Sequence, residues 1–188
     1  MHCAPRWECQ KGGLCISGID HPSSGNFLLL RSGECFATGA CEREARTTDV
    51  NDPFDLQRFV NAQNPVYDQV CAELRAGKKE SHWMWFVFPQ LQGLGHSSMA
   101  TAFGIVSRQE AQAYLDHALL GPRLRECTRF VNLVESRSIS QILGYPDDLK
   151  FRSSMTLFAS VASDNQVFND ALDKYFGGKP DPLTLERL

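Results

Sequence analysis

Apolar residues recur at helical spacing along most of the chain after residue 51, and capping or turn-forming residues separate the repeats. Val66, Val70 and Leu74 follow one another at four-residue intervals, which places them on one face of a helix that Gly77 can end. Similar repeats predict further helices over residues 53–62, 107–118, 121–134, 138–144, 167–176 and 181–188. Because apolar and polar residues nowhere alternate between hairpin turns, the sequence predicts an all-α fold, a compact multi-helix single domain.

Capping residues set several of the predicted helix boundaries. Asp52-Pro53 predicts that the first helix begins there, since an acidic N-cap and a proline in the first turn both favour helix initiation. Ser107 and Glu110 have the spacing of a capping box. Asp181-Pro182 predicts the start of a last helix that covers the core with its leucines, Leu183, Leu185 and Leu188.

The segment from Trp83 to Phe88 is the longest aromatic-rich run and does not fit this periodicity. Six uninterrupted apolar residues suit a buried strand or a buried helix equally well. We expect a short buried helix, because a single strand would have no sheet to satisfy its backbone groups. Polar residues stand on both sides of the run, including His82 and Gln90, so the segment is also a candidate binding wall.

The first 50 residues differ in character from the rest. They are rich in Gly, Ser, Thr and Cys, and Phe27–Leu30 is their only short apolar run, so we expect a poorly ordered N-terminal extension. The helical domain is then expected over residues 51–188. Five of the seven cysteines lie in the extension, without the close Cys-x-x-Cys pairs of zinc sites, and no metal or cofactor is predicted.

Length and charge exclude several classes of function. The chain has 188 residues, 43% of them hydrophobic, which suffices for one well-buried domain. A formal net charge of -3 gives no general attraction to nucleic acid or to anionic membranes, and neither is predicted as a partner. No apolar run approaches the length of a membrane span, and no signal peptide follows Met1, so we expect a soluble cytoplasmic protein.

Several motifs, in order and at matching spacing, resemble those of the family called domain of unknown function 1810. They are Arg58–Gln63, Ser81–Gln90 with Gly93-Leu94-Gly95, Gly121–Leu124, Asp147–Phe158 and Phe176–Asp181. The resemblance covers about residues 53–188 and implies a compact, mainly helical domain without an established activity. Members of the family are sometimes labelled calpastatin-like, but calpastatin acts through long disordered repeats, which a single non-repetitive domain does not provide.

Polar residues within or beside the apolar segments carry the candidate chemistry. His82 is the candidate catalytic residue, because an imidazole beside tryptophans can act as a general base; the alternative is a core histidine with one hydrogen bond. Trp83 and Trp85 cannot share a helical face, so at most one of them meets a ligand. Lys150 and Ser153 would form an anion site if the serine begins a helix; otherwise they are an exposed charge and a cap.

These residues lead to two hypotheses about function. In the first, one pocket binds, and in a stronger version hydrolyses, a small anionic or nucleotide-like ligand; the ligand contacts are Gln63, Lys78, Trp85, Gln90, Lys150 and Ser153, with His82 as the catalytic group. In the second, the protein is a non-catalytic interaction module and the aromatic run is core. A buried, fully bonded His82 favours the module, whereas an open pocket containing His82 and Lys150 favours the ligand site.

Overall fold

A computed structural model describes residues 52–188, and the predicted extension over residues 1–50 lies outside them. The described residues are helical, without a strand; an isolated parallel bridge joins Leu91 to Ile105. The helices are α1 (Gln57–Gln63), α2 (Tyr67–Arg75), α3 (Met84–Val87), α4 (Ser98–Ala102), α5 (Arg108–Asp116), α6 (Leu120–Leu133), α7 (Ile139–Leu143), α8 (Asp147–Val161), α9 (Gln166–Phe176) and α10 (Pro182–Arg187). The predicted all-α class is confirmed for this part of the chain.

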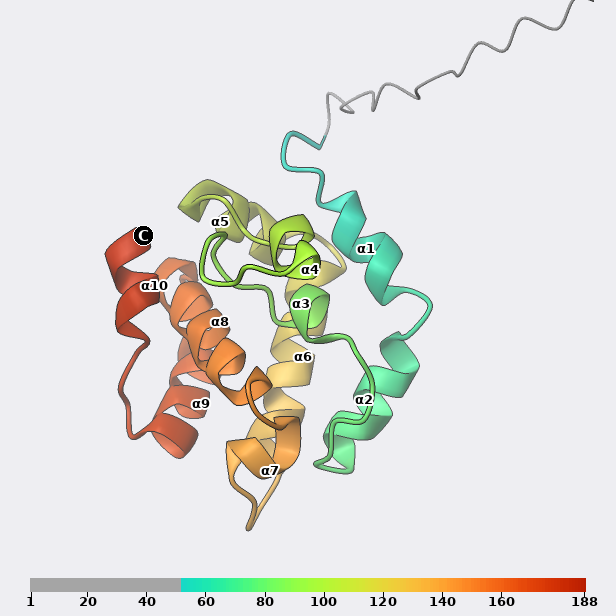
Figure 1. Ribbon diagram of the computed structural model, residues 1–188, viewed down its shortest axis with the longest axis vertical. Coiled ribbons are helices and arrows are strands. Elements are labelled where there is room, and N and C mark those ends of the chain that lie inside the picture. Colours follow the sequence, from blue (N-terminus) through green and yellow to red (C-terminus); the bar gives the residue numbers. More distant parts are fainter. Residues whose placement is uncertain (1–51) are drawn as a thin grey trace, which may run out of the picture. The chain divides into compact units, whose positions relative to one another are not determined.

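Helices α6 and α8 form the centre of the domain, and the other helices pack around them (Figure 1). α8 contacts α5, α7, α9 and α10, while α6 contacts α2, α3, α5 and α9. Phe151 and Phe158 of α8 are fully buried, and each meets an aromatic ring from another part of the chain: Phe88 at 5.0 Å and Tyr114 at 5.5 Å between ring centroids. α8 is therefore enclosed on most sides in its middle, where every residue from 153 to 158 is buried, including the polar Ser153, Ser154 and Thr156.

The first helix begins later than predicted. Asp52 does act as a cap, because its carboxylate accepts hydrogen bonds from the backbone N–H groups of Leu56 (2.8 Å) and Gln57 (2.9 Å). Asp55, however, has a φ of 51°, in the left-handed region, which interrupts a helix. Residues 53–55 therefore form a turn, and α1 begins at Gln57.

The predicted capping box at α5 forms only in part. The Ser107 hydroxyl accepts from the Glu110 N–H at 3.1 Å, but the Glu110 carboxylate does not return to Ser107. It accepts instead from the Val106 N–H at 2.7 Å and forms an ion pair with Arg58 of α1. The Glu110 side chain therefore links α5 to α1 through a buried ion pair and does not complete the local capping box.

The last helix begins as predicted but presents a different face to the core. Asp181 caps α10 by accepting from the Thr184 N–H at 3.1 Å. Thr184 is fully buried and donates its hydroxyl hydrogen to the same carboxylate, while Leu183 and Leu185 are 55% and 47% exposed. The expectation that these two leucines cover the core is wrong, because the cap orients the first turn of α10 with Thr184 inward.

Helix lengths also bear on membrane association. Among residues 52–188, no helix is both long enough and apolar enough to cross a membrane.

Candidate functional site

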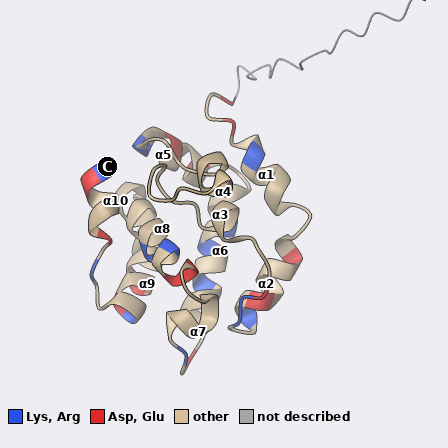
Figure 2. Ribbon diagram, viewed as in Figure 1, with Lys and Arg blue, Asp and Glu red and all other residues tan. Residues whose placement is uncertain are grey.

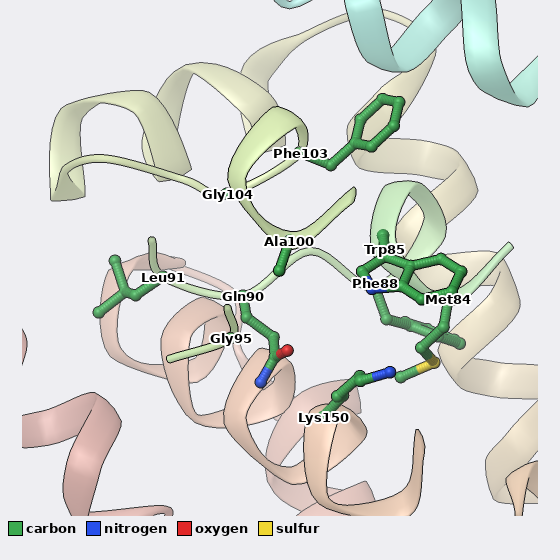
Figure 3. A pocket seen from close by; sticks show the side chains of 10 residues that line it. All are labelled: Met84, Trp85, Phe88, Gln90, Leu91, Gly95, Ala100, Phe103, Gly104 and Lys150. Atoms are coloured by element: carbon green, nitrogen blue, oxygen red, sulfur yellow. The ribbon is translucent and has the colours of Figure 1, made fainter. Parts of the chain in front are cut away.

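A small hollow opens between α3, the loop after it, α4 and α8 (Figure 3). Its cavity volume is only about 10 Å³, about the space of one water molecule. Most of its lining is apolar or glycine, and Gln90 and Lys150 supply the polar side chains. The full lining is Met84, Trp85, Phe88, Gln90, Leu91, Gly95, Ala100, Phe103, Gly104 and Lys150.

Lys150 stands at one side of this hollow, within a cluster of charges at the beginning of α8, where basic and acidic residues occur together (Figure 2). Its Nζ lies 2.6 Å from Asp147 Oδ1 and 4.7 Å from the centroid of the Trp85 ring. The other oxygen of Asp147 is 2.8 Å from Lys79 Nζ. Two lysines therefore share the Asp147 carboxylate, and these three side chains together carry one positive charge. The neighbouring Asp148 carboxylate accepts instead from the Ser140 hydroxyl and the Leu149 N–H.

The electrostatics of Asp147 agree with this arrangement. Burial by itself raises the pKa of Asp147, but hydrogen bonds from Lys150 and Lys79, together with their charges, outweigh burial and lower the pKa below its ordinary value. Asp147 is thus a carboxylate at neutral pH. The Lys79 side chain is only 9% exposed, so its ion pair with Asp147 is largely shielded from water.

Helix α3, which carries Met84 and Trp85, is positioned by a buried glutamate that the sequence did not reveal as important. Glu73 of α2 accepts hydrogen bonds from the backbone N–H groups of Glu80 (2.9 Å) and Ser81 (3.2 Å) and from Trp83 Nε1 (2.8 Å). The Ser81 hydroxyl donates to it as well, at 2.6 Å. Glu73 thereby holds the segment before α3 against α2.

Burial raises the pKa of Glu73, but the converging donors exceed that effect and lower the pKa from 4.5 to about 2. The two tryptophans beside this segment consequently differ in role. Trp83 is 1% exposed and bound to Glu73, so it is a packing residue, whereas Trp85 is half-buried and lines the hollow.

Close backbone contacts shape the other side of the hollow. A Cβ atom at Gly104 would lie 2.8 Å from the Ala100 carbonyl oxygen and 3.0 Å from Gln92 Cα. Only glycine allows the end of α4 to approach the loop this closely. The same loop carries Gln90, whose backbone oxygen accepts from the Ile105 N–H at 2.8 Å.

Three of the predicted site residues meet at this hollow: Trp85, Gln90 and Lys150. In Figure 3, Lys150 extends from α8 beside Met84, and Gln90 projects toward α8 from the loop that follows α3. The aromatic run and the start of α8 therefore face each other across this hollow.

The remaining predicted ligand contacts lie elsewhere. Gln63 is buried, donating to the Phe86 carbonyl (2.7 Å) and the Tyr114 hydroxyl (3.0 Å), so it joins α1, α3 and α5. Lys78 is exposed and pairs with Glu80 at 2.8 Å. Neither residue lines the hollow.

Ser153 does not begin a helix, because α8 starts six residues earlier at Asp147. Its buried hydroxyl lies 3.2 Å from the Leu149 carbonyl and 3.0 Å from Asp181 Oδ2. The conditional anion site at a helix start is therefore not present at Ser153, which links α8 to the cap of α10.

His82 is exposed and is not among the residues that line the hollow. Neither of the two arrangements expected for it, a buried and fully bonded ring or a ring inside an open pocket with Lys150, is found. Its catalytic role remains a prediction without a surrounding site.

The candidate site residues taken from the sequence include neither Lys79 nor Asp147. The spacing of Asp147 and Lys150, three residues apart, could have indicated their ion pair once a helix was assigned to both. Nothing in the sequence distinguishes Lys79 from the exposed Lys78 beside it. Within residues 52–188, no three His, Cys, Asp or Glu side chains are grouped so as to hold a metal ion.

Comparison with known proteins identifies a matching family and a solved structure with a similar fold. Residues 53–188 match the family described as "Protein of unknown function (DUF1810)". A solved structure, described as that of the conserved hypothetical protein Rv1873 from Mycobacterium tuberculosis, is 62% identical in sequence with a TM-score of 0.72; the similarity covers 73% of this chain and 98% of that chain. No curated protein matches the chain. The family match includes every helix that borders the hollow.

Proposed function

Because the chain belongs to the DUF1810 family, whose description assigns no activity, we propose a function from the geometry of the hollow: it binds a small organic anion, such as a monocarboxylate. The observation that carries the proposal is the excess positive charge of the Lys79, Asp147 and Lys150 cluster beside an otherwise apolar cavity. An acid with an apolar body would meet both requirements.

Lys150 is the residue that receives the anion. Lys79 continues to neutralise Asp147 when Lys150 turns toward a ligand, so the carboxylate is never left without a partner. The Gln90 amide lies on the same hollow and supplies a neutral donor to the second oxygen of the ligand. The half-buried Trp85 and Phe103 provide apolar surface for its body.

The volume of the hollow restricts the size of the ligand. Pockets for drug-sized ligands measure roughly 300 to 1,000 Å³, whereas the cavity volume here is only about 10 Å³, about the space of one water molecule. The cavity therefore admits a single small group, such as the carboxylate of the ligand, and the apolar body of the acid lies at its mouth; a whole nucleotide does not fit. None of the residues that line it is a nucleophile or a free general base, so we propose binding and not hydrolysis.

Thermal unfolding in the presence of acetate, butyrate and benzoate tests the proposal, with the corresponding neutral amides at equal concentration. At least one acid is expected to raise Tm while its amide does not, because a ligand at about 100 times its Kd adds about 2.7 kcal/mol of stability. If none of the acids exceeds its amide, the proposal is refuted.

Two variants assign the effect to the hollow. Lys150→Met keeps the length of the side chain and removes the charge; we expect acid binding to weaken about tenfold or more, since a hydrogen bond to a charged group is worth about 1.5–3 kcal/mol. Lys78→Met is the matched control, because Lys78 is exposed and pairs only with Glu80. Equal responses of the two variants would place any anion binding outside this hollow.

A further inference from the structure

Helices α2 and α6 contact each other, and two pairs of side chains between them show that they run in the same direction. Near the start of both helices, the Arg123 guanidinium lies 4.3 Å from the centroid of the Tyr67 ring. Two turns further along, Arg75 of α2 lies 4.3 Å from the centroid of the Phe130 ring of α6. The midpoint of this contact series is therefore occupied by residue 71 on one helix and residue 127 on the other.

Both of these residues are free, buried cysteines, and their thiols interact with each other across the interface. Cys71 is 5% exposed and Cys127 is fully buried. The Tyr67 hydroxyl, one turn before Cys71, donates to Glu126 Oε2 at 2.7 Å, which fixes the alignment of the two helices beside the thiols. A pair of thiols is thus held at one level of a well-defined helix interface.

We propose that Cys71 and Cys127 form an oxidisable dithiol, which a peroxide converts into a disulfide bond between α2 and α6. The inference is independent of the proposed anion site, because neither cysteine lines that hollow.

Cys71 is the cysteine that attacks first. The interaction of its thiol with that of Cys127 lowers the pKa of Cys71 from 9.0 to about 7 against the effect of burial, while the same interaction and burial raise the pKa of Cys127. A larger fraction of Cys71 than of an ordinary thiol is therefore present as the reactive thiolate at pH 7. The Arg75 charge also lowers the pKa of Cys71, whereas the nearby Glu126 carboxylate raises it.

The reaction proceeds in two balanced steps. The Cys71 thiolate attacks one oxygen of the peroxide, the O–O bond breaks, and the released hydroxide takes up a proton, which leaves Cys71 as a sulfenic acid. Cys127 then loses its proton and its sulfur attacks Cys71 Sγ, so the S–S bond forms and the hydroxyl leaves as water. Two thiols are oxidised by two electrons, and one hydrogen peroxide is reduced to two waters.

The burial of the two cysteines limits the size of the oxidant that can reach them. Cys71 retains 5% exposure, which admits hydrogen peroxide more readily than a bulky disulfide such as oxidised glutathione. Peroxide is therefore the expected oxidant class.

Peptide mapping of the full-length protein tests the proposal. The folded chain is treated with hydrogen peroxide at pH 7, free thiols are alkylated, and the protein is digested with trypsin under non-reducing conditions. Cys71 then lies in peptide 59–75 and Cys127 in peptide 126–129, apart from the five cysteines of the first 41 residues. We expect the 59–75/126–129 disulfide to appear within one molecule and to increase at least tenfold over the untreated sample.

Variants and other products distinguish this chemistry from nonspecific oxidation. In Cys127→Ser, Cys71 should stop at the sulfenic acid and be trapped by dimedone, whereas in Cys71→Ser the Cys127 thiol should survive treatment. Recovery of both peptides as alkylated thiols from oxidised wild-type protein would overturn the proposal. So would conversion of Cys71 to a sulfinic acid without pairing, or pairing that requires denaturant.

Discussion

Replacing Glu73 with glutamine tests whether a buried charge holds the segment that leads into α3. Glu73 is only 8% exposed, and donors converge on both of its oxygens: the N–H groups of Glu80 and Ser81, Trp83 Nε1, the Ser81 hydroxyl and Gln69 Nε2. A glutamine can direct its oxygen toward the three N–H donors of Oε2. The Ser81 hydroxyl and the Gln69 amide can reverse their roles and accept from its NH₂ group. Glu73→Gln therefore removes the charge and little else.

The magnitude follows from the pKa. A fall from 4.5 to about 2 in the folded protein makes the ionised side chain worth about 3 kcal/mol of folding free energy at pH 7. Because the folded pKa is lowered, this stability is fully present above about pH 4.5 and is lost as the pH falls through about 2. The variant should thus be about 3 kcal/mol less stable than wild type at pH 7, and by less than half of that at pH 3.

Urea unfolding followed by far-ultraviolet circular dichroism, at several pH values between 3 and 7, measures both quantities. Glu80→Gln is the matched control, since the Glu80 side chain is 63% exposed and pairs only with Lys78; its free energy of unfolding should change by less than about 0.5 kcal/mol. A Glu73→Gln loss that is equal at pH 3 and pH 7 would show that shape, and not charge, explains the role of Glu73. If Glu73→Gln lost no stability at either pH, Glu73 would not be the residue that holds the segment before α3.

Other buried polar groups give further expectations. Arg58→Met should lower the free energy of unfolding by about 3 kcal/mol or more, because it leaves the 1% exposed carboxylate of Glu110 without its cation; urea unfolding measures the loss, and a change below about 1 kcal/mol would contradict a buried ion pair. Thr184→Val should cost about 1–2 kcal/mol, since the Asp181 cap loses a donor. Leu183→Ser should change stability by less than about 0.5 kcal/mol, because Leu183 is 55% exposed. If Leu183→Ser lowered the free energy of unfolding more than Thr184→Val, the leucine face of α10 would cover the core, as the sequence predicted.

The boundaries of most helices could be predicted from the sequence because capping is local. Gly77 follows α2 with a φ of 65°, and Gly177 ends α9 in the left-handed conformation. Asp181 caps α10 through a backbone N–H only three residues away. Each of these interactions depends on a few neighbouring residues, so the chain itself specifies them.

The candidate site was only partly predictable, because it depends on which residues become neighbours. Trp85, Gln90 and Lys150 stood out as polar or aromatic groups beside apolar segments, and they line one hollow. Gln63 and Ser153 stood out for the same reason, yet they donate hydrogen bonds inside the core. A polar residue within an apolar sequence has the same appearance whether its partner is a ligand or another helix.

The sequence by itself determined the all-α class, the short helix within the aromatic run and the family to which the chain belongs. Only the tertiary structure decided that Glu73 holds Trp83, that Lys79 and Lys150 share Asp147, and that Cys71 lies opposite Cys127. The physical reason is the range of the interactions involved. Helical periodicity and capping act over a few residues, whereas burial of a charge or pairing of two thiols requires helices that are distant in sequence to pack in one particular alignment.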